Sequence, residues 1–284
     1  IKGMIVQSGN DATVALAEGV GRSEERFVEM MNNQATVLAM KGTSYRNPEG
    51  LTQAGHVTSA RDLGVLATRL MRDFPEFVGY YAIKKYRYAG TPATNDSNRN
   101  LLLFRDPSVD GLKTGFTDAA GYCMIATARR DFPNLAPAGT AQAGAGSRRL
   151  LSIVLGAASE NARANESQKL LNWGYTAFDA VKLFDAGQPV LTPVVWKGTQ
   201  GTVKIGRLQP VIVTVPAGLA GKVTTSVARA EPLVAPFAQG QVVASLKVSI
   251  GDRVLAELPL VALEAVPQSG FFGRTWDAVR LWIR

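Results

Sequence analysis

The sequence contains little of the two residues that most often build metal centres and redox sites. Its 284 residues include one cysteine, Cys123, and one histidine, His56. A single cysteine excludes an intrachain disulfide. Cys123 lies within residues 121–126, a run typical of a buried strand, so we expect a packed thiol rather than a reactive one. Because carboxylates do not cluster either, the sequence predicts no metal site and no cofactor.

Acidic residues are scarcer than basic ones. Asp and Glu number 23 against 31 Lys and Arg, which gives a formal net charge of +8. Such an excess favours an anionic partner, which can be nucleic acid, a membrane surface or an acidic substrate. Because the basic residues are scattered rather than gathered in a stripe with interleaved aromatics, we expect no nucleic-acid partner. A solvated basic surface without a specific partner is the alternative.

The first part of the chain has the pattern of helices. Ser23 is a candidate N-cap, followed by two acidic residues that suit the positive end of a helix, and Gly42 is a candidate stop. A second helix is expected to begin at Thr58 or Ser59 and to end before Pro75. These helices precede the part of the chain in which we expect strands.

The middle of the chain alternates in the manner of strands. Residues 111–117, 121–129 and 150–156 are expected to be neighbours in an antiparallel sheet, and residues 131–146, rich in Ala, Gly and Pro, to form a surface loop. A long helix is expected over residues 161–181. Helices before and after such strands predict an α/β fold with helices packed on the sheet.

The composition changes after about residue 186. Short Val-rich runs separated by Gly and Pro predict a small all-β sandwich over residues 187–267, a domain separate from residues 1–186. The expected strands are residues 192–196, 201–205, 211–215, 222–227, 241–249 and 253–261.

The last segment, residues 268–284, predicts an amphipathic helix. On a helical wheel of residues 270–284, aromatic and aliphatic side chains gather on one side and Arg and Asp on the other. Its length of roughly 20 Å is too short to span a bilayer core of about 30 Å. It suits a helix that lies in the headgroup plane. A terminal helix docked on its own protein is the alternative.

Two short motifs carry chemistry. Lys113-Thr114-Gly115 ends a predicted strand, where a cation and a hydroxyl can hold a substrate carboxylate and glycine lets a substrate backbone approach. The backbone N–H of Phe116 is placed to face a developing oxyanion. Ser8-Gly9-Asn10 precedes a helix-forming run, so its hydroxyl and amide can point from an interhelical turn into a cleft.

With these motifs the chain resembles the serine D-alanyl-D-alanine carboxypeptidases, the low-molecular-mass penicillin-binding proteins. That family carries Ser-x-x-Lys, Ser-Gly-Asn and Lys-Thr-Gly motifs. The resemblance implies that residues 1–186 are the C-terminal part of the catalytic domain and that residues 268–284 are a membrane anchor. The likeness extends over residues 8–12, 98–100, 109–117 and 163–167, the β domain and residues 270–274.

The resemblance also implies a mechanism. A serine attacks the penultimate D-Ala carbonyl of a peptidoglycan stem peptide, and water releases the shortened peptide from the acyl-enzyme. Ser8 would relay a proton to the leaving amine, Asn10 would bind the substrate amide, and Lys113 would supply positive potential and orient Ser8.

Further residues are implied in substrate binding. Thr114, Arg99 and Arg163 would recognise the terminal carboxylate, with Arg163 as the direct or water-bridged contact. For each arginine, a structural ion pair is the alternative. His56 occupies a position where the family often has histidine, and we expect it to pack or cap a loop rather than to act in catalysis.

One motif of the family is missing, because no serine in the sequence is followed by lysine at the third position after it. We expect that the chain is truncated before residue 1 and that these residues alone neither react with penicillin nor cleave D-Ala-D-Ala. The leading expectation for the whole protein is a peripheral enzyme on the periplasmic side of the bacterial inner membrane. It would act on the peptidoglycan pentapeptide, react with β-lactams and bind the membrane surface through residues 270–284. A class A-like β-lactamase and a non-catalytic homologue that binds cell wall or membrane are the alternatives.

Overall fold

The computed structural model describes residues 1–87, 91–135 and 145–282. The chain divides into two compact units. Unit 1 comprises residues 1–130 and 149–175, and unit 2 comprises residues 131–148 and 176–284.

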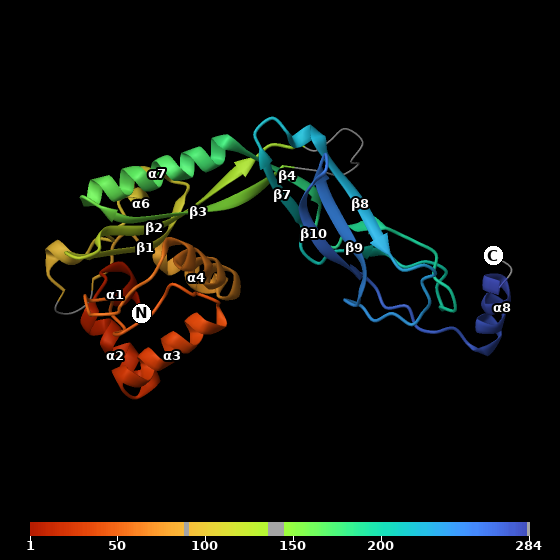
Figure 1. Cartoon of the computed structure of the whole chain (residues 1–284), viewed down its shortest axis with the longest axis horizontal. Helices are drawn as coiled ribbons and strands as arrows, with labels where there is room; N and C mark the ends of the chain where they lie inside the picture. Colours follow the sequence, from red (N-terminus) through yellow and green to blue (C-terminus); the bar gives the residue numbers. More distant parts are fainter. Residues whose placement is uncertain (88–90, 136–144, 283–284) are drawn as a thin grey trace. The chain divides into compact units, whose positions relative to one another are not determined.

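Unit 1 is a three-stranded sheet with helices on both faces (Figure 1). In Figure 1, α7 runs across one face, and α1 to α4 lie on the other side. Short 3₁₀ turns occupy Pro75–Phe77 and Ala93–Asn95. The other elements of this part of the chain are α1 (Lys2–Val6), α2 (Asn10–Gly21), α3 (Glu24–Val37), α4 (Ala60–Asp73), α5 (Val78–Tyr81), α6 (Leu102–Arg105), β1 (Val109–Thr117), β2 (Gly121–Phe132), β3 (Gly146–Ala157) and α7 (Glu160–Ala177).

The three predicted strands are confirmed, in the order β1-β2-β3. β1 pairs antiparallel with β2, and the register sets Lys113 opposite Ile125 and Gly115 opposite Cys123. Of the predicted loop between β2 and β3, residues 136–144 lie outside the described residues. The sheet therefore presents the Lys-Thr-Gly motif along β1, with β2 as the neighbour of that strand.

The apolar core of unit 1 holds the sheet against α6 and α7. Aliphatic side chains from these helices and from the first two strands fill it, among them Leu102, Met124 and Leu171, each at most 1% exposed. A second, smaller cluster ties the end of α3 to α4. Val109 of β1 belongs to the core of unit 1, and Leu112 and Thr114 of the same strand are buried as well. β1 is therefore held firmly in the sheet.

The predicted N-cap at Ser23 is confirmed, and the second helix starts where it was expected, with Ser59 as its N-cap. Ser23 Oγ accepts from Arg26 N at 3.2 Å and Ser59 Oγ accepts from Asp62 N at 3.1 Å. The predicted stop at Gly42 is wrong, because α3 ends at Val37 and the chain turns away at Ala39, whose φ is +56°.

Gly42 has a different role. Its N–H donates to the buried Asp62 Oδ2 at 2.8 Å, and a Cβ there would lie 3.3 Å from that oxygen. The glycine therefore allows a close approach between the loop after α3 and the first turn of α4.

Unit 2 is built around two antiparallel sheets, one in the order β5-β6-β10-β9-β8 and one of β4 and β7. Its core is aliphatic and includes Val203, Ile205, Leu246 and Leu260, each fully buried. A 3₁₀ turn spans Ala220–Lys222. The other elements are β4 (Phe178–Phe184), β5 (Pro189–Leu191), β6 (Ile205–Gly206), β7 (Val211–Pro216), β8 (Val223–Arg229), β9 (Val242–Ile250), β10 (Arg253–Ala262) and α8 (Phe271–Trp282).

Four predicted strands of the β domain are confirmed, as β7 to β10. The predicted strand at residues 192–196 is wrong: the regular strand β5 precedes it, and only isolated bridges occur at Val194 and Trp196. The strand predicted at 201–205 is reduced to a bridge at Thr202 and to β6.

The helix predicted over residues 161–181 ends four residues early, at Ala177. From Phe178 the chain is the strand β4, which pairs with β7 from Phe178↔Pro216 onward. The apolar residues at alternating positions of β4, such as Val181 and Leu183, are buried in the core of unit 2. Tertiary pairing therefore overrides the helical propensity of this segment. The predicted domain boundary at residue 186 stays a prediction.

Helix α8 forms over most of the predicted terminal helix. Residues 283 and 284 lie outside the described residues. Among the helices of the described residues, none has the length and apolarity that a membrane crossing requires.

Candidate active site

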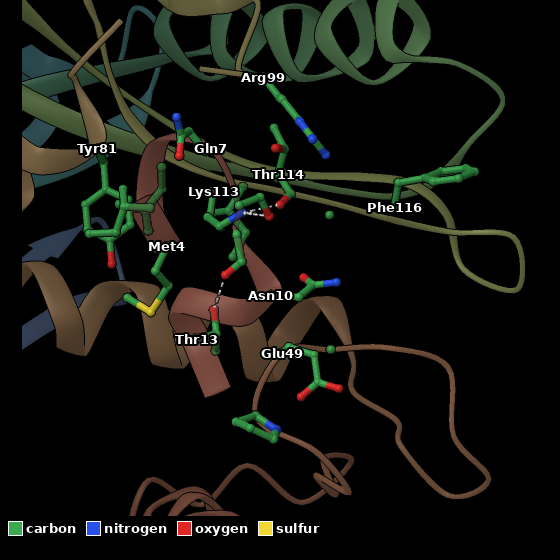
Figure 2. A pocket seen from close by; sticks show the side chains of 18 of the residues that line it. Met4, Gln7, Asn10, Thr13, Glu49, Tyr81, Arg99, Lys113, Thr114 and Phe116 are labelled. Atoms are coloured by element: carbon green, nitrogen blue, oxygen red, sulfur yellow. Dashed lines mark hydrogen bonds between the residues drawn. The ribbon is translucent and has the colours of Figure 1, made fainter. Parts of the chain in front are cut away.

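One cavity in unit 1, of about 920 Å³, is lined by both motifs. We call this cavity the cleft. Figure 2 shows Lys113 and Thr114 on β1 facing Asn10 at the start of α2. All eight residues predicted for the site line the cleft: Ser8, Asn10, Arg99, Lys113, Thr114, Gly115, Phe116 and Arg163. The structure thus brings together residues that are far apart in the sequence.

Ser8 lies on the turn between α1 and α2, as predicted. Its φ of +55° is a left-handed conformation that side chains other than glycine rarely adopt, and such strain persists only where the surroundings enforce it. Two contacts at Gly9 do so: its N–H donates to Gly3 O at 3.2 Å, and its carbonyl accepts from Thr13 Oγ1 at 2.9 Å. The turn therefore holds the Ser8 hydroxyl toward β1.

Lys113 joins the two motifs. Its Nζ donates to Ser8 Oγ at 2.7 Å and to Thr114 O at 2.8 Å. Burial, together with the charges of Arg99 and Arg163, lowers the pKa of Lys113 to about 8. The ammonium is therefore a poorly solvated cation, aimed at a hydroxyl that is 105 residues away in the sequence.

The end of β1 leaves room for a substrate. Gly115 is exposed, and a Cβ built on it would meet no atom within 4 Å. The neighbouring Thr114 is buried, whereas the ring of Phe116 is 50% exposed and lies 4.3 Å from the ring of Tyr122, centroid to centroid. A peptide backbone can therefore lie against Gly115 without a steric obstacle.

The two arginines of the cleft differ in exposure. Arg163 is 2% exposed, and its guanidinium donates to Gly115 O at 3.1 Å and to Arg99 O at 3.3 Å. It also lies 5.4 Å from the centroid of the Tyr122 ring and pairs with Glu160 at 3.4 Å. Burial lowers the pKa of Arg163. This guanidinium is engaged in holding the backbone of the cleft.

Arg99 is exposed and reaches toward Thr114 (Figure 2). Its guanidinium donates to Asn95 Oδ1 at 3.1 Å. Of the two arginines, Arg99 therefore presents the more accessible charge to an anion in the cleft.

Two buried asparagines flank Arg99. Asn100 Nδ2 donates to Gly111 O at 3.0 Å, and Asn98 Oδ1 accepts from Asn100 N at 2.9 Å. The segment that carries Arg99 is thereby tied to β1. The sequence marks this stretch only through the family resemblance, and no role for Asn98, Asn100 or Tyr122 was predicted. The sequence signal that could have indicated a structural role is the asparagine on each side of Arg99.

His56 lies outside the cleft lining. Its Nδ1 accepts from Arg46 N at 3.2 Å, and its ring meets Tyr45 edge-on at 5.8 Å. Burial lowers the pKa of His56. These contacts agree with the predicted loop-packing role.

Cys123 was expected to be buried, and it is only partly so. Its Sγ lies 3.5 Å from Ala120 O at the start of β2. The strand assignment is confirmed, and the degree of burial is corrected: at this end of β2 the neighbouring positions 118–120 are exposed, which leaves the thiol side of the strand incompletely covered.

The arrangement suits recognition of an anion beside a hydroxyl that can pass a proton. Three cations, Arg99, Lys113 and Arg163, line the cleft together with the Asn10 amide. A cation held in a partly desolvated cleft attracts a carboxylate more strongly than it would in water.

Comparisons with known proteins agree with this geometry. Residues 1–138 match the D-alanyl-D-alanine carboxypeptidase family, and residues 178–268 match the C-terminal domain of penicillin-binding protein 5. The chain is 37% identical over 282 residues to D-alanyl-D-alanine carboxypeptidase DacC of Escherichia coli, covering 99% of this chain and 66% of that protein. It is 33% identical to DacA of Haemophilus influenzae, covering 100% of this chain and 68% of that protein.

Solved structures give the same picture. Penicillin-binding protein 5 from Haemophilus influenzae matches with a TM-score of 0.75 at 32% identity, covering 94% of this chain and 73% of that chain. Penicillin-binding protein D2 from Listeria monocytogenes in its ampicillin-bound form matches with a TM-score of 0.51 at 32% identity, covering 61% of this chain and 65% of that chain. The chain spans about two thirds of the length of the curated relatives it matches. These relatives do not favour the alternative of a class A-like β-lactamase.

Proposed function

Since the chain belongs to the family of D-alanyl-D-alanine carboxypeptidases, a class of serine hydrolases, we propose that the whole protein removes the terminal D-Ala from peptidoglycan stem peptides. The reaction passes through a serine acyl-enzyme, and β-lactams acylate the same serine. The observation that carries this proposal is the 2.7 Å hydrogen bond from Lys113 Nζ to Ser8 Oγ, which unites the two motifs.

The hydrogen bond supports a direction for proton transfer. Because the ammonium of Lys113 donates to Ser8 Oγ, the hydroxyl proton of Ser8 is left to point into the cleft, toward the amine that leaves. Asn10, at the first position of α2, supplies an amide to the substrate peptide. Ser8 thus acts as the proton relay, and Lys113 lowers the energy of the negative charge that develops beside it.

Recognition of the terminal carboxylate falls to Arg99 and Thr114, which line the cleft. We propose Arg99, in place of the expected Arg163, as the direct charge contact, because the Arg99 side chain is exposed in the cleft and Arg163 is buried. Thr114 would add a hydrogen bond. Arg163 holds Gly115 O and Arg99 O, and so fixes the part of the cleft on which the carboxylate rests. The backbone N–H of Phe116 serves the developing oxyanion.

We propose that the nucleophile lies in a Ser-x-x-Lys segment of the whole protein, because the 284 residues contain no such motif and span about two thirds of the length of the relatives. These residues then supply substrate recognition and proton relay, and the acylating serine enters the same cleft. The relatives named D-alanyl-D-alanine carboxypeptidases are longer than this chain, which supports the proposal of a further segment.

The test is release of D-Ala from a pentapeptide by the full-length protein, followed with a coupled assay. We expect turnover by the full-length protein and none by the 284-residue chain. A fluorescent penicillin should label the first covalently and leave the second unlabelled. A covalent adduct on the 284-residue chain, or a full-length protein that binds the pentapeptide without cleaving it, would contradict the proposal.

We further propose that α8 attaches the protein to the periplasmic face of the inner membrane. The aromatic side chains of its apolar face are exposed, with Phe272 at 88% and Trp282 at 87%. The net charge of +8 suits an anionic lipid surface.

Deleting residues 270–284 should release the full-length protein from phosphatidylglycerol-containing vesicles in a sedimentation assay, with D-Ala release unchanged. A truncated protein that still sediments with the vesicles would contradict the attachment.

A further inference from the structure

Helix α8 packs on unit 2 with its polar side. Asp277 Oδ2 accepts a hydrogen bond from Lys197 N at 2.7 Å. One turn further on, the guanidinium carbon of Arg280 lies 5.5 Å from the centroid of the Trp196 ring. Positions 277 and 280 are three apart, so both side chains leave the helix on the same side.

The aromatic side chains of α8 face solvent, whereas Leu281 is half-buried. Phe271 is 68% exposed and Trp276 is 66% exposed, as well as Phe272 and Trp282. A helix that docks on its own domain for stability buries its apolar side, because that burial is the main source of favourable free energy. The arrangement here is the reverse.

The segment that receives α8 is itself held from two directions. Trp196 N donates to Leu233 O at 2.8 Å, which ties it to the body of unit 2. Ser269 N donates to Lys197 O at 2.8 Å and Thr199 N donates to Pro267 O at 2.9 Å, which ties it to the chain entering α8. We call residues 196–199 the receiving loop.

Lys197 is the strained point of the receiving loop. Its φ of +57° is a left-handed conformation that costs energy for a residue with a side chain. In this conformation its N–H meets the Asp277 carboxylate and its carbonyl meets Ser269 N. The strain is therefore located where the loop contacts α8 and the segment that leads to it.

We propose that the receiving loop is a clamp that fixes the rotation of α8 about its own axis, so that unit 2 displays the apolar side of the helix outward to a lipid surface. Asp277 and Arg280 are the positioning residues of this clamp. The display serves the membrane attachment proposed above and rests on it, but the clamp itself is a contact within unit 2. The lipid surface it fits is anionic, because Arg274 and Arg280 flank the displayed side.

The first test is hydrogen exchange at the amide of Lys197 in the full-length protein, resolved by NMR. Asp277→Ala removes the acceptor of this amide, and we expect its exchange to become about tenfold faster, the effect of losing one hydrogen bond to a charged group. Asp277→Asn retains an acceptor oxygen and should restore most of the protection. Arg274→Ala is the matched control, because Arg274 lies on the same helix and donates to Gln268 Oε1.

The second test is a pulsed electron-electron distance measurement between nitroxides on Ala278 of α8 and Thr225 of β8, in a Cys123→Ser background. We expect one narrow distance distribution in the protein without further changes and with Arg274→Ala. With Asp277→Ala combined with Arg280→Ala, the distribution should broaden. A broad distance distribution in the unchanged protein would contradict the clamp. An exchange rate of the Lys197 amide that is the same with and without Asp277→Ala would also contradict it.

Failure of the clamp and failure of membrane attachment are distinguishable. If the protein does not sediment with phosphatidylglycerol vesicles but both tests give the expected results, the clamp stands and the attachment falls. If the protein sediments but α8 is loose in both tests, the attachment stands and the clamp falls.

Discussion

The two units of the molecule differ in what they bury. In the described part of the chain, every polar or charged residue that is buried lies in unit 1: Gln7, Asp62, Asn98, Asn100, Thr114, Thr127, Ser152, Arg163 and Ser167. The core of unit 2 consists of aliphatic side chains and one phenylalanine ring. The contrast is between a unit that buries polar and charged side chains and a unit whose core is apolar.

Burying polar groups has a physical consequence for unit 1. A buried cation costs free energy unless partners compensate it, and Arg163 and Lys113 find these partners mainly among backbone carbonyls and one hydroxyl. Unit 2 carries no such burden in the described residues that form its core. Unit 1 therefore gives up stability for a preorganised site, and unit 2 does not.

The largest effect that would test this contrast concerns Lys113. In the full-length enzyme, Lys113→Ala should slow acylation by a chromogenic cephalosporin by about 10²- to 10⁴-fold, because the cation beside Ser8 is lost. Stopped-flow absorbance measures the rate constant. Lys182→Ala in β4, which breaks the 2.8 Å pair with Asp185, is the control and should leave the rate unchanged. An acylation rate constant of the Lys113→Ala enzyme within threefold of that of the unchanged protein would contradict the assignment of the site to unit 1.

A second prediction compares the effect of creating a cavity in the core of each unit. Leu246 and Leu102 are both fully buried, one in each unit. Leu246→Ala should lower the free energy of unfolding of unit 2 by about 2–5 kcal/mol, because of the cavity left behind. Hydrogen exchange followed by mass spectrometry measures this loss. The acylation rate of the folded Leu246→Ala protein should stay within twofold of that of the unchanged protein, whereas Leu102→Ala should lower it. Equal losses in the two variants would contradict the distinction between the units.

Substitution of the two arginines of the cleft should change different properties of the enzyme. Arg163→Met leaves two backbone carbonyls without donors and should reduce the free energy of unfolding by about 1–3 kcal/mol, together with kcat. Arg99→Ala should raise KM for the peptide while stability changes by less than about 0.5 kcal/mol. Chemical denaturation and steady-state kinetics on the same preparations check both. Equal losses of stability would contradict the assignment of Arg163 as a positioning residue.

The smallest effect is a change with pH. Burying Lys113 lowers the free energy of unfolding, and the size of this loss depends on pH. Its pKa of about 8 lies below the ordinary value of 10.5. Below pH 8 the lysine is protonated in both states, and the folded protein bears the full cost. Between about pH 8 and 10.5 the unfolded chain binds the additional proton, so the cost fades as pH rises.

Lys113→Met should therefore exceed the unchanged protein in free energy of unfolding by about 1–3 kcal/mol at pH 7, and this gap should narrow toward pH 10. Denaturant titrations at the two pH values measure it. A gap that is constant with pH would show that Lys113 does not carry a lowered pKa.

The sequence predicted the elements whose signals are local. Ser23 and Ser59 cap helices through their own hydroxyls, and the strands of the first sheet alternate within a few residues. The motifs could be placed in one cleft because each has a family pattern. The helix predicted to residue 181 failed because β4 pairs with β7, about 35 residues further along, and no local pattern records that partner.

The burial of Arg163 could not be predicted for a related reason. On the sequence it is an arginine on a helix, for which exposure is the common outcome. Its burial results from the carbonyls of Gly115 and Arg99, which three separate segments bring together. The polar side of α8 likewise meets Trp196 and Lys197, about 80 residues earlier in the chain.

In the proposed mechanism, Ser8 and Lys113 assist an acylating serine supplied by a Ser-x-x-Lys segment. Peptide mapping by mass spectrometry, after the full-length protein reacts with benzylpenicillin, tests it most directly. We expect one adduct, on the serine of that segment, formed far more slowly when Lys113 is replaced by alanine. An adduct on Ser8, or equal labelling with and without Lys113, would contradict it.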